Sequence, residues 1–138
     1  MAADPETLFH TDLRLVFQRG AVDLALEAQG LSTVTGLDNL VQALSLRLLV
    51  DRGDLSAIGH PRYGSRIRDL IGETMDRPNR ELIRRYVRRA LLDDPRVQDV
   101  VDTVVSVRAD APDSVDVRAV VKAIDGSEIQ LEVTLDAV

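Results

Sequence analysis

The C-terminal third of the chain alternates apolar and polar residues in three successive runs, and this pattern restricts the possible folds most strongly. A period of two is typical of strands that bury one face. Asp125-Gly126, between the second and third runs, is a strong tight-turn signal, and we expect Pro112 to interrupt the first connection. The sequence therefore predicts a three-stranded antiparallel sheet. Its apolar positions are Val101, Thr103, Val105 and Val107, then Val115, Val117, Ala119, Val121 and Ala123, then Ile129, Leu131, Val133 and Leu135.

Two shorter runs near the N-terminus show the same alternation. Leu13, Leu15 and Phe17 alternate in the first run, and Arg19-Gly20 separates it from a second run in which Val22, Leu24 and Leu26 alternate. Two alternating runs joined by a short glycine-containing connection predict a β-hairpin. We expect residues 1–11 to form a flexible tail.

Helical periodicity fills the middle of the chain. The first helix is expected to run from Asp38, as N-cap, to about Asp51, with Gly53 at its C-terminal end. Apolar residues lie on two of its sides, which predicts burial within the domain or under a partner. A short helix over residues 66–71 and a longer one from Pro78 to Asp93 follow. The predicted order is ββαααβββ, an α+β fold with helices on an antiparallel sheet, in a single domain over residues 1–138.

The helix over residues 78–93 carries an arginine face opposite its apolar face. We place Leu91 and Leu92 on the arginine side, and arginines with large apolar residues are good interface anchors. Pro95 ends the helix, so we expect Asp94 and Arg96 at an exposed corner. The face is interpreted as a solvated surface, a protein interface or a nucleic-acid contact. Its members are Arg77, Arg80, Arg84 and Arg88, with Arg85 and Arg89 beside them.

The charge of the chain is unevenly distributed. The formal net charge is −6 over 138 residues, yet residues 62–96 hold ten Arg against six acidic residues. An acidic body argues against bulk nucleic-acid binding, which depends on a summed positive field, and suits docking of the arginine segment on an acidic protein surface. There are no cysteines, and no apolar run approaches the roughly 20 residues that a membrane span needs. We expect cytoplasmic synthesis without membrane insertion.

No set of residues typical of catalysis stands out. A glycosidase needs two carboxylates roughly 5–10 Å apart, and the 23 acidic residues give no such pair by their pattern. His10 and His60 are fifty residues apart, and His60 lies in a turn-like His60-Pro-Arg-Tyr-Gly segment. The sequence therefore predicts no enzyme, no metal and no cofactor. A cell-wall glycosidase and a nucleic-acid adaptor that uses the arginine helix stay open as alternatives.

The last predicted strand, residues 128–136, is a second possible contact surface. Its apolar positions include Ile129, Leu131 and Val133. A chain-terminal strand is often the edge of its sheet, and an edge offers unpaired backbone groups to an incoming strand.

Four segments of the chain form an ordered set: Gly36–Leu44 with Leu46–Leu49, Arg52–Leu55, His60–Ser65 and Asp94–Val97. In this order they resemble the baseplate assembly protein W family of contractile phage tails and related contractile injection systems. This baseplate wedge family is sometimes labelled lysozyme-like. The resemblance covers roughly Leu31–Val138, and the order of the segments makes it fairly specific.

The resemblance implies a structural role. Members of the family join wedge proteins into the inner baseplate ring around the tail tube and provide the platform for sheath polymerisation. Their fold resembles the sheath domain, so sheath strands can be added to their sheet. The implied partners are wedge proteins, the sheath protein and tube or hub proteins. Six copies, assembled in the cytoplasm into a phage virion or injection particle, are expected.

The family's Glu-Pro-Arg motif, which contacts the helical core of the wedge, corresponds here to Asp94, Pro95 and Arg96. Asp in place of Glu shortens the carboxylate by one methylene, and Arg96 can still form a bidentate carboxylate pair. The predicted interface residues are Asp94, Pro95, Arg96, Arg84, Arg85, Arg88, Arg89, Leu92, Ile129, Leu131 and Val133.

Overall fold

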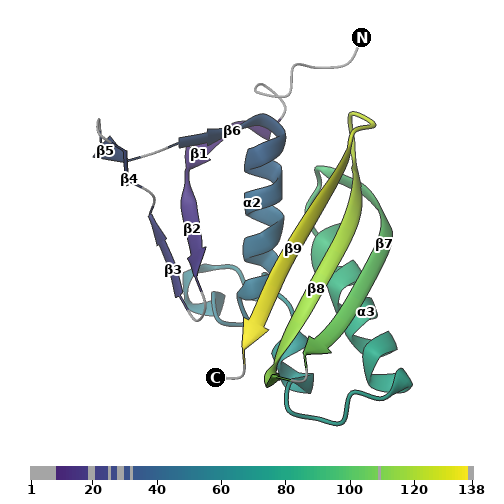
Figure 1. Cartoon of the computed structure of the whole chain (residues 1–138). Coiled ribbons are helices and arrows are strands. Elements are labelled where there is room, and N and C mark those ends of the chain that lie inside the picture. Colours follow the sequence, from purple (N-terminus) through teal and green to yellow (C-terminus); the bar gives the residue numbers. More distant parts are fainter. Residues whose placement is uncertain are drawn as a thin grey trace.

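Two helices packed on one face of a three-stranded sheet make up the main body, with short paired strands beside it (Figure 1). This arrangement confirms the predicted α+β class. Within the described ranges, no helix combines the length and apolarity needed to cross a membrane. The computed structural model describes residues 9–18, 21–24, 26–27, 30–31, 33–108 and 110–136.

The sheet contains β7 (Val97–Arg108), β8 (Ala111–Ala123) and β9 (Glu128–Asp136) in the order β7-β8-β9, all antiparallel. The register between β8 and β9 runs without a break, and Gly126 turns the chain between them with a φ of 91°. The predicted apolar positions of β8 and β9 are all buried. Side-chain alternation and turn chemistry therefore predicted these two strands correctly.

Strand β7 departs from the predicted alternation. Val100 and Val105 are buried, whereas Val101 is 53% exposed. The pairing with β8 shifts between Val100 and Asp102, and such a β-bulge changes which residues face the core. The prediction was therefore wrong at Val101. It was also wrong at Pro112, which lies inside β8 instead of in the connection.

Helix α2 (Gly36–Leu49) packs against β9, and α3 (Arg77–Leu92) packs along β7 (Figure 1). Leu40, Leu44 and Leu48 on α2 are fully buried in the core, so this stripe is covered by the domain itself. Leu91 on α3 is also fully buried, which corrects its predicted place on the arginine side. Two short 3-10 helices lie between them, η1 (Ser56–Ile58) and η2 (Ile67–Leu70), and the second replaces the predicted short α-helix.

The ends of the two helices were predicted unequally well. For α3, Asp76 is the N-cap and accepts a hydrogen bond from the Asn79 backbone N–H at 3.0 Å, with Pro78 in the first turn as predicted. For α2, Thr35 is the N-cap and Asp38 lies in the first turn, so the predicted cap was wrong by three residues. At its other end α2 is capped by Val50, and Gly53 belongs to the turn that follows.

The predicted N-terminal hairpin is confirmed by β2 (Leu15–Gln18) and β3 (Ala21–Leu24), which pair antiparallel. Its Arg19-Gly20 connection lies outside the described residues. Two further short pairings were not predicted. They join β1 (Thr11–Leu13) to β6 (Thr33–Thr35) and β4 (Leu26–Glu27) to β5 (Gly30–Leu31).

The predicted flexible tail was wrong at its C-terminal end, because Phe9 is fully buried and Thr11 already belongs to β1. Two buried amides on α2 hold this segment. Asn39 Nδ2 donates to the Phe9 carbonyl at 2.7 Å, and the Gln42 side chain donates to the Leu13 carbonyl at 2.7 Å. Residues 1–8 of the predicted tail lie outside the described residues. Asn39 and Gln42 therefore lie on a buried polar side of α2, where their amides hydrogen-bond to backbone carbonyls of the preceding segment.

Candidate protein interface

The four predicted α3 arginines, Arg84, Arg85, Arg88 and Arg89, are all exposed. Two have partners: Arg84 pairs with Glu81 at 2.8 Å, and Arg88 pairs with Asp99 of β7 at 3.0 Å. Arg85 and Arg89 form no ion pair within the described part of the chain. Exposed ion pairs contribute little to stability, so a partner's carboxylates can replace the two that Arg84 and Arg88 use here.

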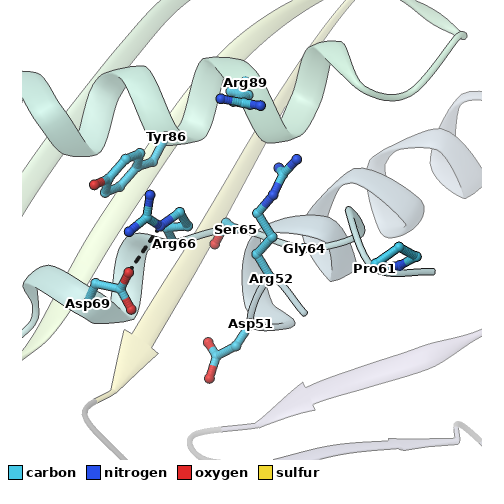
Figure 2. Close-up of a pocket in the computed structure, with 9 residues that line it drawn as sticks. All are labelled: Asp51, Arg52, Pro61, Gly64, Ser65, Arg66, Asp69, Tyr86 and Arg89. Carbon is cyan, nitrogen blue, oxygen red and sulfur yellow. Dashed lines mark hydrogen bonds and ion pairs between the residues drawn. The ribbon is translucent and has the colours of Figure 1, made fainter. Parts of the chain in front are cut away.

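A cavity of about 450 Å³ lies beneath this face, between α3 and the turn at residues 61–66 (Figure 2). Arg66 crosses it, paired with Asp69 at 3.2 Å and with its guanidinium 5.3 Å from the centre of the Tyr86 ring. Arg52 points across the opening toward the α3 segment that carries Arg89 (Figure 2). The lining residues are Asp51, Arg52, Pro61, Gly64, Ser65, Arg66, Asp69, Tyr86 and Arg89.

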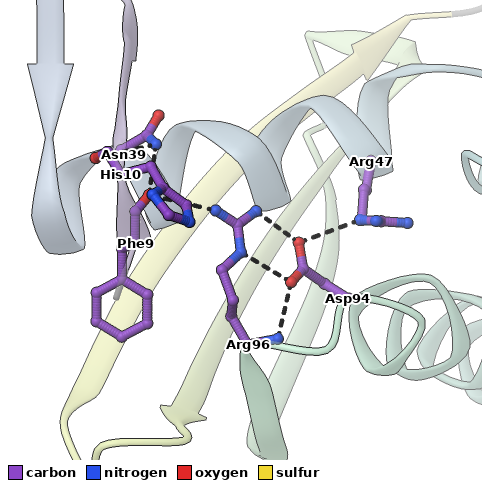
Figure 3. A network of polar contacts seen from close by, with 6 residues as sticks. All are labelled: Phe9, His10, Asn39, Arg47, Asp94 and Arg96. Atoms are coloured by element: carbon purple, nitrogen blue, oxygen red, sulfur yellow. Dashed lines mark hydrogen bonds and ion pairs between the residues drawn. The ribbon is translucent and has the colours of Figure 1, made fainter. Parts of the chain in front are cut away.

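A compact ion-pair network forms at the corner after α3 (Figure 3). The carboxylate of Asp94 accepts from Arg96 Nε at 3.0 Å, from Arg96 Nη2 at 2.8 Å and from the Arg96 backbone N–H at 2.9 Å. Arg47 Nε of α2 donates to the same carboxylate at 3.4 Å. Burial alone would raise the pKa of Asp94, but the hydrogen bonds from Arg96 and the charges of Arg96 and Arg47 lower this pKa overall.

The predicted exposed corner needs correction. Asp94 is only 1% exposed, because its carboxylate points inward to Arg96 and Arg47. The bidentate pair expected of Arg96 is formed inside the chain, and the hydrogen bond to Asp94 raises the pKa of Arg96. Arg96 Nη1 also donates to the Phe9 carbonyl at 3.5 Å. Pro95 remains on the surface of this corner.

The other predicted interface residues divide into exposed and buried ones. Leu92 is 38% exposed at the end of α3. Ile129, Leu131 and Val133 are 8%, 2% and 6% exposed, because they point into the core. Any contact through β9 must therefore use its backbone edge and outward side chains.

A model of the contractile injection system sheath initiator family matches residues 11–126. The chain belongs to this family. The match confirms the resemblance to a baseplate family, and it gives the chain a structural role in the baseplate of a contractile injection system.

The fold has a counterpart among solved structures. A crystal structure of a Geobacter sulfurreducens protein, described as a candidate tail lysozyme, superposes with a TM-score of 0.62. The two chains are 16% identical, and the similarity covers 84% of this chain and 97% of the other. At this identity the likeness shows a common fold alone. A search of the curated proteins found no significant match.

Two residues of the corner were missed by the sequence analysis. The Arg47 guanidinium lies 4.8 Å from the centre of the Tyr63 ring, in addition to its bond with Asp94. Tyr63 is half-buried, and this burial is the main cause that raises the pKa of its hydroxyl. Both belong to the segments that carried the family resemblance, which was the available signal. In the described ranges, no three His, Cys, Asp or Glu side chains gather as a metal site would require.

Proposed function

We propose that this chain joins the wedge proteins into the inner baseplate ring around the tube and provides the platform on which the sheath begins to polymerise. Membership of the sheath initiator family over residues 11–126 supports this proposal. We take residues 1–138 as one non-enzymatic domain, present in six copies per baseplate and assembled in the cytoplasm into a phage or injection particle.

The observation that carries the platform role is the regular open edge of β9. In the described part of the chain β9 pairs with β8 alone, through an unbroken register. The opposite edge strand, β7, has three register shifts, and Arg88 donates to the Val100 carbonyl there at 3.2 Å. Bulges hinder strand addition, and β9 shows no register shift; its Asp136 carbonyl, at the end of the strand, accepts from Arg68 Nε at 3.1 Å. A sheath strand is therefore expected to pair with β9.

Hydrogen exchange can test which edge is used. We expect alternate amides of β9 to exchange rapidly in the isolated chain, because they face the open edge. Adding the sheath protein of the same system should slow their exchange by roughly tenfold or more, since they then donate to the added strand. Residue-resolved NMR would measure this, with β7 amides as the internal control. Protection of β7 alone, or of neither edge, would contradict the assignment.

The arginine face and the adjoining corner form the proposed contact with the wedge proteins. Arg85, Arg89, Leu92 and Pro95 provide exposed charge and apolar surface at this end of α3. Asp94 and Arg96 have a supporting role instead, because they are paired with each other. They fix the shape of the corner that the partner contacts.

Pull-down from the native lysate tests this contact. The tagged chain should recover wedge and sheath proteins, and Arg85→Glu should reduce the recovery of the wedge proteins at least tenfold, because it places a carboxylate against an acidic partner. Arg118→Glu is the matched control, since Arg118 is an exposed arginine on the middle strand of the sheet. Mass spectrometry and negative-stain imaging would measure recovery. Equal losses in both variants, or recovery of nucleic acid alone, would refute the proposed contact.

The alternative of a cell-wall glycosidase gains no support from the cavity. The cavity lining contains two carboxylates. Asp51 is paired with Arg68 at 2.7 Å, and Asp69 is paired with Arg66 at 3.2 Å. A glycosidase needs one carboxyl group free to protonate the leaving oxygen and another to act at the sugar carbon. Arginines that occupy both carboxylates compete with that chemistry.

A further inference from the structure

We infer that the cavity between α3 and the turn at residues 61–66 binds an acidic side chain of a partner protein. This inference rests on the proposed baseplate function and names the partner chemistry at one part of the arginine face. Nothing in the family match assigns this cavity a ligand.

The charge of the lining calls for a carboxylate. Arg66 is paired with Asp69, and Asp51 is paired with Arg68, which lies outside the lining. Of the other two lining guanidiniums, Arg89 has no ion pair within the described residues, and Arg52 forms a long pair of 3.4 Å with the partly exposed Asp93. Guanidinium groups bind carboxylates through two parallel hydrogen bonds, so a partner's Asp or Glu complements this pair of arginines.

The floor of the cavity is fixed before any partner arrives. Ser65 Oγ donates to the Leu48 carbonyl at 2.7 Å, and the Ser65 backbone N–H donates to the Val50 carbonyl at 2.9 Å. The Arg52 N–H in turn donates to the Ser65 carbonyl at 2.9 Å. A floor that is already ordered lowers the entropy cost of binding, which favours a short ligand with few contacts.

The size and the surroundings favour a polypeptide over a nucleic acid. A volume of about 450 Å³ accommodates one or two side chains. Tyr86 and the arginines are residue types that anchor protein interfaces. The whole chain has a net charge of −6, which repels a long polyanion, whereas a short acidic segment senses mainly charges within roughly 8 Å.

The test uses the full chain and a fluorescein-labelled peptide of alternating Asp and Leu, followed by fluorescence anisotropy. We expect saturable binding that weakens by roughly tenfold in Arg89→Ala and falls as salt is raised. Arg80→Ala is the matched control, because Arg80 is an exposed α3 arginine outside the cavity lining. A peptide of alternating Asn and Leu should bind at least tenfold more weakly.

Three results would overturn the inference: equal binding of the Asn peptide, an equal effect of Arg80→Ala, or stronger binding of a single-stranded oligonucleotide than of the acidic peptide. The experiment separates this inference from the proposed function. If the chain is recovered in sheathed particles but does not bind the peptide, the cavity assignment fails alone. If it binds the peptide but wedge and sheath proteins are never recovered with it, the baseplate proposal fails and the cavity site stands.

Discussion

Replacing Asp94 by Asn is expected to lower the free energy of unfolding by about 3 kcal/mol, with a fall in Tm of roughly 10 °C. The carboxylate is 1% exposed and accepts three hydrogen bonds from Arg96 and one from Arg47. Asn keeps the shape of the side chain but removes the charge. Two largely buried guanidiniums would then lack their counter-ion, which costs more than the loss of an exposed pair.

Urea denaturation of the wild type and the variant across pH provides the measurement. The folded pKa of Asp94 is lowered, so its carboxylate stabilises the fold above the ordinary value of 3.8, and this contribution is lost as pH falls through the folded pKa. The two proteins should therefore differ most near neutral pH and converge in acid. Asp99→Asn is the control, because its pair with Arg88 is about half exposed, and it should cost less than about 1 kcal/mol. Equal losses in the two variants would show that Asp94 has no special role.

The strands that could be predicted are those whose pattern is local. The apolar positions of β8 and β9, and the Asp125-Gly126 turn between them, follow from side-chain alternation and from the φ that Gly126 supplies. The bulge at Val101 could not be predicted in this way. The extra residue in β7 can be recognised only from the pairing of β7 with β8. It changes which of the preceding apolar side chains point toward the core.

The prediction that Asp94 is exposed at the corner after α3 was wrong for a related reason. A proline after a helix predicts a surface turn, and Pro95 is indeed exposed. The burial of Asp94 depends on Arg47, which is 47 residues away, and Arg96 reaches the Phe9 carbonyl 87 residues away. No periodicity or local spacing encodes such contacts. The sequence therefore located the motif but not the direction in which its carboxylate points.

The turn at residues 61–66 connects this corner with the cavity. Tyr63 lies against Arg47 of the corner network, while Ser65 forms the cavity floor. Arg52 of the lining also pairs with Asp93, next to Asp94. A partner that binds the cavity would thus contact a segment that is linked to the corner through Arg47 and Asp93. Gly64, between these two contact points, has tighter surroundings than Gly53, Gly59, Gly72 and Gly126.

Gly64→Ala is expected to lower the free energy of unfolding by about 3 kcal/mol, because two costs combine. Gly64 has a φ of 103°, a region that strains residues with a Cβ. An added Cβ would also lie 2.5 Å from the Val50 carbonyl oxygen and 2.9 Å from the Arg52 backbone nitrogen. Both are backbone atoms of the paired segment that Ser65 joins, so no flexible side chain can move aside.

Gly59→Ala separates these two costs. Gly59 has a φ of 91°, but nothing lies within 4 Å of a Cβ added there, so only the backbone strain of about 1 kcal/mol applies. Urea denaturation of both variants would measure the difference. Binding of the acidic peptide should weaken in Gly64→Ala under conditions where the protein remains folded, because the displaced backbone carries Arg52 and Ser65. Similar stability losses in the two variants would mean that the close approach of the Gly64 backbone to Val50 does not constrain this turn.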